Sequence, residues 1–396
     1  MESWLNWTIW QIRRAYKWLQ GSTLTRYVAH NRTKLQDLGY LLIEYVEDGK
    51  MLSSSWHRHR DNPQKRKNLY SSLANIMLSL ANVPLPRIGS WTMDNDGIIS
   101  LTNRPFTDLT AFWARHEIPV NIPRVSSASP SSVYALFIVI SDISTSVQEL
   151  TYASADSYLR DLLSYQDTRM KHQPNAILDR KDGVDQLSSL VALRAIFHQL
   201  YNTCLNPQFV MTFSDMHQSN IFVDEDWNIT RLIDLEFACS GPIELLNVPS
   251  WLSGVGVDQL AQHLEEYKLL YDQFVDAIAE QEVATRQSNA LSQRMRDDWA
   301  SGRLWYSIAL GSINAFPALF ADHFGSKYFK DWKFSRDAWP LAQLWGENAS
   351  EFIDEKVAEM EAYNHKVREV FREAAEFQCA PEAERVDAQQ DDEKAE

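Results

Sequence analysis

The chain has 396 residues, of which 45% are hydrophobic, so it is long enough and apolar enough to build a substantial buried core. Its formal net charge of −15 argues against nucleic acid as the main partner, because no excess of Lys and Arg is present to neutralise phosphates. The cysteines, Cys204, Cys239 and Cys379, are odd in number and far apart. They predict no disulfide framework and favour a reducing, cytoplasmic location.

The first 38 residues are predicted to form a helix and a linker. The helix is aromatic and basic, with Trp4, Trp7, Trp10, Arg13, Arg14 and Lys17. Two interpretations stay open. An aromatic stripe at helical spacing favours a helix that docks on its own domain, whereas the basic and aromatic composition of residues 3–19 also suits a membrane surface or a transit segment. No hydrophobic run is long enough to cross a membrane, so no integral membrane segment is expected.

The next elements are predicted from periodicity and turn residues. Residues 39–46, GYLLIEYV, read as one buried strand. A helix is expected to end before Pro84, because hydrophobic residues recur on one helical face at Leu69, Leu73, Ile76, Met77 and Leu80. A turn sequence at residues 94–97, between β-prone flanks, predicts a hairpin.

Helical patterns dominate the remaining sequence. Residues 122–155 are Ser-rich, lack periodicity and are predicted to be an insertion. From residue 157 onward, hydrophobic residues recur at spacings of three and four, and residues 379–396 are expected to form an acidic, disordered tail. The pattern therefore predicts an α+β, mainly α, fold with short antiparallel hairpins.

The most informative stretch, residues 213–237, reads FSDMHQSNIFVDEDWNITRLIDLEF. Two β-prone runs flank the turn residues DEDWN, which predicts two antiparallel strands joined by a tight connection. Asn220 and Asp234 each lie seven residues from Trp227, so the pairing is expected to place them side by side. The acidic residues between the strands, Asp224, Glu225 and Asp226, are expected to be turn and surface residues.

This spacing suits a metal-assisted reaction. Mg²⁺ typically takes one or two protein oxygens and completes its shell with water and phosphate, so Asn220 and Asp234 are predicted metal ligands. Asp215, five residues before Asn220, is the predicted catalytic base that takes the proton from an attacking hydroxyl. Kinase-type phosphoryl transfer uses this order of base and ligands.

The same residues resemble the Asp-x-His-x-x-Asn and Ile-Asp-x-Glu signatures of the aminoglycoside phosphotransferase and choline-kinase-like family, in particular its filamentous-fungal branch. The matching positions are Asp215, His217, Asn220, Asp234 and Glu236. The resemblance runs from about residue 39 to about residue 320. It implies the C-terminal lobe of a protein-kinase-like fold and an ATP- and Mg²⁺-dependent phosphotransferase that acts on a small-molecule hydroxyl.

Further residues also receive predicted roles, one of them from the resemblance. Residues 39–50 are similar to the family's interlobe linker, which implies that the backbone of Glu44, Tyr45 and Val46 contacts the adenine. His217 is expected to be structural or, alternatively, to act beside the metal, and Glu236 to support Asp234 or the metal. Four aromatic residues are expected to be core or, alternatively, to line an acceptor pocket: Trp251, Trp305, Tyr306 and Phe316.

The sequence departs from the family before the linker, where the family carries a Gly-rich phosphate loop and a strand Lys. The 38 residues ahead of Gly39 contain one glycine, Gly21, and neither Lys17 nor Lys34 lies in a strand-like pattern. Most of an N-terminal lobe is therefore expected to be absent, and the phosphotransferase-like domain to span residues 39–378. The alternative function is that of a catalytically inactive, kinase-like remnant that acts as a binding or scaffold protein.

Overall fold

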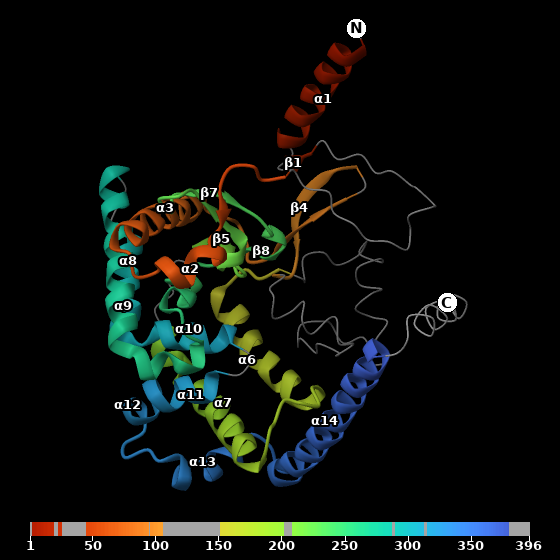
Figure 1. Cartoon of the computed structure of the whole chain (residues 1–396), viewed down its shortest axis with the longest axis vertical. Coiled ribbons are helices and arrows are strands. Elements are labelled where there is room, and N and C mark those ends of the chain that lie inside the picture. The colour runs from red at the N-terminus through yellow and green to blue at the C-terminus, as the bar shows by residue number, and fades with distance from the viewer. Residues whose placement is uncertain are drawn as a thin grey trace, which may run out of the picture.

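The fold is α+β and mainly α, as the sequence predicts. The computed structural model describes residues 2–19, 23–25, 45–94, 96–105, 151–201, 208–286, 290–312 and 315–379. Within them, helices build most of the body, and the strands gather into small antiparallel sheets in its upper half (Figure 1).

The helices occur along the whole of the described chain. In order they are α1 (Glu2–Leu19), α2 (Ser53–His59), α3 (Pro63–Ala81), α6 (Ala155–His172), α7 (Arg180–Tyr201), α8 (Leu264–Ala284), α9 (Ala290–Ser301), α10 (Arg303–Gly311), α11 (Phe316–Phe320), α12 (Ser326–Tyr328), α13 (Phe334–Ala342) and α14 (Ala349–Cys379). Helix α3 packs on α8, and α7 packs on α11, α13 and α14. A continuous core of buried residues runs through these contacts, so the described helical body packs as one unit.

The described strands form three small sheets. They are β1 (Thr23–Leu24), β2 (Lys50–Met51), β3 (Ser90–Met93), β4 (Ile98–Asn103), β5 (Phe209–Phe213), β6 (Ile221–Val223), β7 (Ile229–Leu232) and β8 (Ala238–Pro242). Their orders are β1-β4-β3, β2-β6-β7 and β5-β8, and every pairing is antiparallel. The two predicted hairpins are confirmed as β3-β4 and β6-β7.

The predicted helix before Pro84 is confirmed as α3, and its ends follow local chemistry. The Asn62 side chain accepts hydrogen bonds from the backbone N–H groups of Gln64 and Lys65, and Pro63 occupies the first helical position. Leu69, Leu73 and Met77 are buried against the body. This anchored helix supports the hairpin described below.

Two predicted segment boundaries need correction, and one predicted strand lies mostly outside the described residues. Of the strand predicted at 39–46, residues 39–44 lie outside the described residues, Tyr45 and Val46 form no strand, and the next strand along the chain is β2 at Lys50. Thr23 and Leu24, assigned to a separate N-terminal unit, pair with Ile99 and Ile98 of β4. Residues 151–155, assigned to the insertion, pack in the body, because Tyr152 pairs with Ile88 and α6 begins at Ala155.

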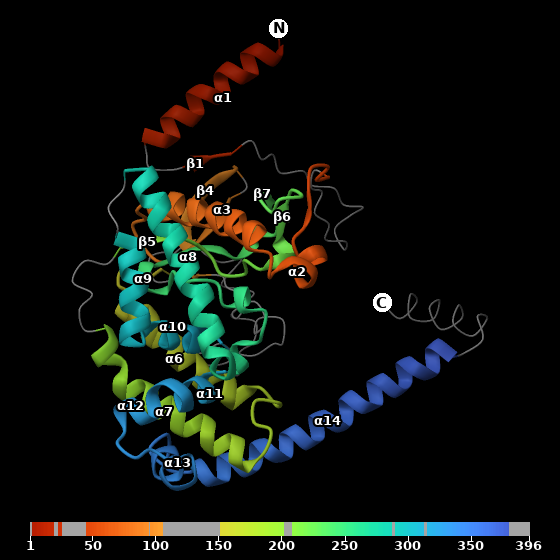
Figure 2. The ribbon, with the colours of Figure 1, turned by 60° about the vertical axis from the view of Figure 1, so that its left-hand side comes forward.

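Helix α1 projects away from the body, and so does the far end of α14 (Figure 2). The interpretation of α1 as a helix docked face-on against its own domain is therefore wrong, because hydrophobic side chains such as Trp18 and Leu19 are more than 70% exposed. Among the described residues, no helix combines the length and hydrophobicity that crossing a membrane requires. Residues 106–150 and 380–396, which hold most of the predicted insertion and tail, lie outside the described residues.

Candidate functional site

The turn of the β6-β7 hairpin is organised by the Asp224 side chain. Its Oδ1 accepts hydrogen bonds from the backbone N–H groups of Asp226 and Asn228 at 2.9 and 2.8 Å, and its Oδ2 accepts one from the Asn228 amide at 2.8 Å. These bonds favour the ionised carboxylate and lower the pKa of Asp224. Asp224 is therefore a turn residue, as predicted, and Trp227 completes the turn with a left-handed φ of 67°.

Elements from the N-terminal part of the chain brace this hairpin. Lys65 Nζ donates to the Glu225 carbonyl at 2.6 Å, and the Asn68 amide donates to the Asp226 carbonyl at 2.9 Å, so α3 holds the turn. On the other side β2 pairs with β6 through Lys50–Val223 and Met51–Phe222. The predicted linker segment thus ends beside the predicted catalytic hairpin.

The register of the hairpin differs by one residue from the prediction. The paired residues are Ile221 with Leu232, Phe222 with Arg231, and Val223 with Ile229, with a bulge between Phe222 and Val223. The bulge adds one residue to β7, so Asn220 faces Ile233, whose N–H donates to the Asn220 carbonyl at 3.0 Å. Asp234 lies one position further along, and the prediction that it pairs directly with Asn220 is wrong.

The backbone conformation of Asp234 compensates for this offset. Side chains alternate between the faces of a strand, so a regular continuation of β7 would turn Asp234 to the face opposite that of Ile233. Asp234 instead has φ 57° and ψ 53°, in the left-handed region, and it begins a short 3-10 turn at 235–237. The strand alternation ends there, and the Asp234 side chain lines the same pocket as Asn220 and Asp215.

The loop before β6 fixes Asp215. The Asn220 amide nitrogen donates to the Asp215 carbonyl at 2.9 Å, so the acceptor that this buried amide side chain offers is its Oδ1. His217 Nδ1 accepts the Ser219 N–H at 3.2 Å, so the ring proton of the neutral imidazole lies on Nε2. That Nε2 lies 3.5 Å from Asp215 Oδ1. His217, rather than Asp215, caps the 3-10 turn at 218–220.

A row of three tryptophans, Trp251, Trp56 and Trp227, ends at the loop that carries Asp215. The Trp251 indole N–H donates to the Met216 carbonyl at 2.6 Å, so its role is to hold the loop. Trp251 meets Trp56 edge-on at 5.3 Å, and Trp56 stacks on Trp227 at 5.6 Å. The Trp227 indole in turn donates to Ser55 Oγ at 3.1 Å. This aromatic row connects the turn of the hairpin, α2 and the loop of Asp215.

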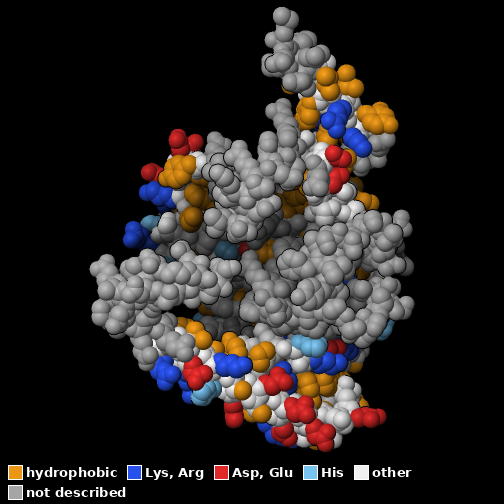
Figure 3. Space-filling model, turned by 90° about the vertical axis from the view of Figure 1, so that its right-hand side faces the viewer, with side chains coloured by type: hydrophobic (Ala, Val, Ile, Leu, Met, Phe, Trp, Pro, Cys, Tyr) orange, Lys and Arg blue, Asp and Glu red, His pale blue; other side chains and the backbone are white. Residues whose placement is uncertain are grey.

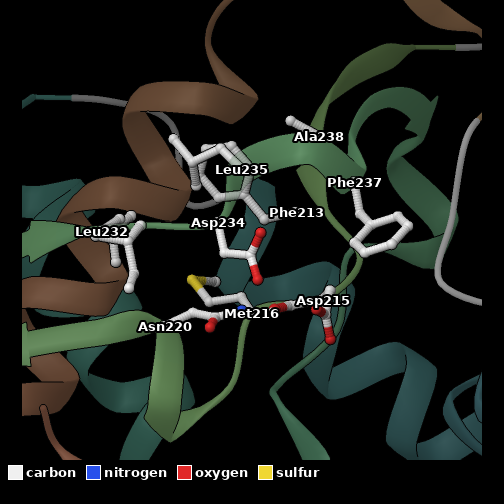
Figure 4. A pocket seen from close by; sticks show the side chains of 10 residues that line it. Phe213, Asp215, Met216, Asn220, Leu232, Asp234, Leu235, Phe237 and Ala238 are labelled. Carbon is white, nitrogen blue, oxygen red and sulfur yellow. Dashed lines mark hydrogen bonds between the residues drawn. The ribbon is translucent and has the colours of Figure 1, made fainter. Parts of the chain in front are cut away.

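The pocket itself combines polar and hydrophobic side chains. It is a small pocket open to solvent, and its lining is formed by Phe213, Asp215, Met216, Asn220, Leu232, Ile233, Asp234, Leu235, Phe237 and Ala238. In Figure 4 the carboxylate of Asp234 lies at the centre of the view, above Met216 and between Asn220 and Asp215. Asp215, the predicted base, and Asn220 and Asp234, the predicted metal ligands, thus all line this pocket.

The oxygen atoms of this pocket suit a hard divalent cation. Asp215 and Asp234 place two carboxylates against a largely hydrophobic lining, where a counterion lowers their electrostatic free energy. Within the described part of the chain, no group of three or more His, Cys, Asp and Glu side chains forms a metal cage. Carboxylate and amide oxygens are the ligand types that Mg²⁺ takes in proteins, usually one or two of them together with several waters.

The other predicted site residues do not join the pocket in the described structure. Tyr45 is exposed and Val46 half-buried, five and four residues before β2, and neither lines the pocket; Glu44 lies outside the described residues. Trp305, Tyr306 and Phe316 are buried core residues. Sequence reasoning missed the hydrophobic lining from Phe213, Leu235 and neighbouring residues, although their positions beside Asp215 and Asp234 in the sequence could have indicated it.

Comparison of the chain with protein-family models, with curated proteins and with solved structures finds no match in any of the three. The arguments for function therefore rest on the residues and on the geometry of this pocket.

Proposed function

We propose that the chain is an ATP- and Mg²⁺-dependent phosphotransferase that acts on a hydroxyl group of a small molecule. The observation that carries the proposal is the convergence of Asp215, Asn220 and Asp234 on one solvent-open pocket. An acid that can take a proton, beside two oxygens that can hold a divalent ion, is what phosphoryl transfer to an alcohol requires.

Each residue has a distinct role in this proposal. Asp215 accepts the proton of the attacking hydroxyl, while the His217 N–H steadies its carboxylate from 3.5 Å. Asn220 Oδ1 and the Asp234 carboxylate hold Mg²⁺, which when bound neutralises and orients the phosphates. Trp251 keeps the loop in place through the Met216 carbonyl. Positioning of this kind supplies much of the rate acceleration in phosphoryl transfer.

A second candidate function is a binding or scaffold protein that keeps the pocket without the reaction. One observation favours it: Lys17, one of the two lysines before residue 39, lies on the projecting helix α1 and not on a strand beside the pocket (Figure 2). Binding of Mg²⁺ and nucleotide separates the two candidates.

The test is thermal unfolding of the full chain with a non-hydrolysable ATP analogue, with Mg²⁺ or with EDTA. A ligand at about 100 times its dissociation constant stabilises the folded state by about 2.7 kcal/mol, so the melting temperature should rise with the analogue and Mg²⁺ together. Asp234→Asn should abolish the Mg²⁺-dependent part of this rise.

Asp226→Asn is the matched control for Asp234→Asn. It removes the same charge from an exposed side chain on the same hairpin, and the hydrogen bonds of Asp226 described above use only its backbone. We expect its stabilisation by the analogue and Mg²⁺ to equal that of the unmodified chain. If the unmodified chain shows no rise, or if both variants lose it equally, the pocket does not hold a metal-nucleotide complex and the proposal fails.

A further inference from the structure

Helix α1 separates hydrophobic and basic side chains onto opposite sides. With 3.6 residues per turn, Ile9, Ile12, Tyr16 and Leu19 fall together on one half of the helix circumference, with Trp18 at its edge. Arg13, Arg14 and Lys17 fall on the other half, where Trp7 and Trp10 lie among them. The hydrophobic half is defined here by Ile9, Ile12, Tyr16, Trp18 and Leu19. A surface helix of a globular protein normally turns such a half toward the core.

In this structure the hydrophobic half of α1 faces solvent. Its five side chains are between 48% and 76% exposed. In Figure 3 hydrophobic and basic side chains lie together on the projecting helix at the top of the molecule. An exposed hydrophobic surface rimmed by polar groups is typical of an interaction site, because leaving it in water costs free energy.

The contact of α1 with the body explains this orientation. The Trp10 indole donates to the Thr25 carbonyl at 3.3 Å, and the Arg14 guanidinium lies over the Trp10 ring at 5.3 Å from its centre. Trp10 belongs to the basic half of the helix. The body therefore lies on the basic side of α1, and the hydrophobic half is turned outward, the orientation that a helix lying in a membrane surface needs.

We propose that α1 docks the protein on an anionic lipid membrane, with its hydrophobic half in the outer acyl region and Arg13, Arg14 and Lys17 among the headgroups. Helices of this composition, with Trp and Tyr beside basic residues and low mean hydropathy, lie in the plane of the interface. Among residues 2–19 three basic residues oppose one acidic residue, Glu2, so the helix carries the charge that anionic lipids attract.

The acidic body does not prevent this association. The whole chain has a formal charge of −15, which an anionic surface repels. Because α1 projects from the body, as Figures 1 and 2 show, most of the body can stay clear of the membrane surface, and charges farther from it than the Debye length of about 8 Å at physiological ionic strength are screened. A pairing of α1 with its copy in a second chain would instead bring two sets of basic side chains together.

The test is cosedimentation of the full chain with vesicles of phosphatidylcholine alone or mixed with phosphatidylserine, at low and high salt. Binding should require phosphatidylserine and weaken with salt. Arg13→Gln with Lys17→Gln should weaken it by about fivefold for each basic residue removed. Ile12→Gln with Leu19→Gln should weaken it by about tenfold or more, since hydrophobic surface no longer enters the membrane.

The matched control is Val370→Gln with Phe371→Gln on α14, where both side chains are more than 60% exposed. It removes a similar exposed hydrophobic area from the other projecting helix and should leave vesicle binding unchanged. Absence of binding to phosphatidylserine vesicles at low salt would overturn the proposal. So would equal losses in the α1 and α14 variants, or self-association in sedimentation velocity that Ile12→Gln with Leu19→Gln abolishes.

Discussion

Asp234 has a backbone conformation that most non-glycine residues avoid, with Asp and Asn among the exceptions. It costs on the order of 1 kcal/mol, and the surrounding hairpin and the 3-10 turn keep it in place. In the described structure the side chain makes no capping hydrogen bond in return. A glycine would adopt the conformation without strain but would lack the carboxylate, so the residue type and the conformation together point to a role for that carboxylate.

Replacing Asp215 by Asn tests the proposed base. The substitution keeps the side-chain size and the backbone carbonyl that Asn220 binds, but an amide cannot take the proton. We expect stabilisation by the ATP analogue and Mg²⁺ to persist. The rate at which labelled phosphate is transferred from ATP to water or to an added alcohol should fall by about 10² to 10⁴-fold. An unchanged rate of release would remove Asp215 from the mechanism.

At the scale of elements, Gly49 permits β2 to pair with the hairpin. Its φ is +101°, and a Cβ atom there would lie 2.8 Å from both the Val223 carbonyl oxygen and Thr230 Oγ1. Gly49→Ala should therefore lower the free energy of unfolding by about 1–3 kcal/mol, from backbone strain and the displaced strand. Chemical denaturation measures the change.

Gly346→Ala is the control for Gly49→Ala. Gly346 has no positive φ, and a Cβ atom there would meet nothing within 4 Å. Its substitution should be neutral or slightly stabilising, because alanine restricts the unfolded chain. Equal effects of the two substitutions would show that β2 does not depend on a glycine at position 49.

Local sequence patterns predicted which helices and hairpins form, but they did not predict how these elements contact one another. The cap at Asn62, the hydrophobic spacing in α3 and the turn chemistry around Asp224 act within a few residues, so the helix and both hairpins could be predicted from sequence. The bulge in β7 could not, because it is set by how β7 pairs with β6 and not by a turn residue in the sequence. Neither could the bond from Trp251 to the Met216 carbonyl, which joins residues 35 positions apart.

The pocket shows the same limit. The spacing of Asp215, Asn220 and Asp234 predicted that they come together, but the predicted direct pairing of Asn220 with Asp234 was wrong by one residue. The left-handed turn at Asp234 restores the convergence, and a strand pattern alone does not predict such a turn. The predicted adenine contact at residues 44–46 stays a prediction.

For the whole molecule, His323 predicts a dependence of stability on pH. Its ring stacks on Trp305 at 3.7 Å, and burial lowers its pKa to about 4. The unfolded chain has a pKa near 6.5 at this residue and binds a proton that the folded state rejects. Stability should therefore fall as the pH drops from about 6.5 to about 4, by about 1.4 kcal/mol per pH unit for this group at most.

His323→Phe isolates this contribution, because phenylalanine keeps a ring against Trp305 but cannot be protonated. The free energy of unfolding should drop less between pH 7 and pH 5 in the variant than in the unmodified chain. The neighbouring Asp322, whose pKa burial raises, has the opposite effect on stability, but it is present in both proteins and cancels in the difference. Identical pH profiles would show that His323 titrates normally in the folded state.

The pairing of β2 with β6 also has a consequence for biosynthesis. Ser55 and Trp227, which bond across this region, are 172 residues apart, so a ribosome adding about 5–20 residues per second completes the second partner about 10–30 s after the first. During that interval Trp56 lacks Trp227 and Trp251, the two tryptophans that it contacts in the folded structure. Hydrophobic surface on α2 is therefore exposed until the β6-β7 hairpin has been synthesised. Exposed surface of this kind promotes aggregation, so we expect chaperones to bind this segment of the nascent chain.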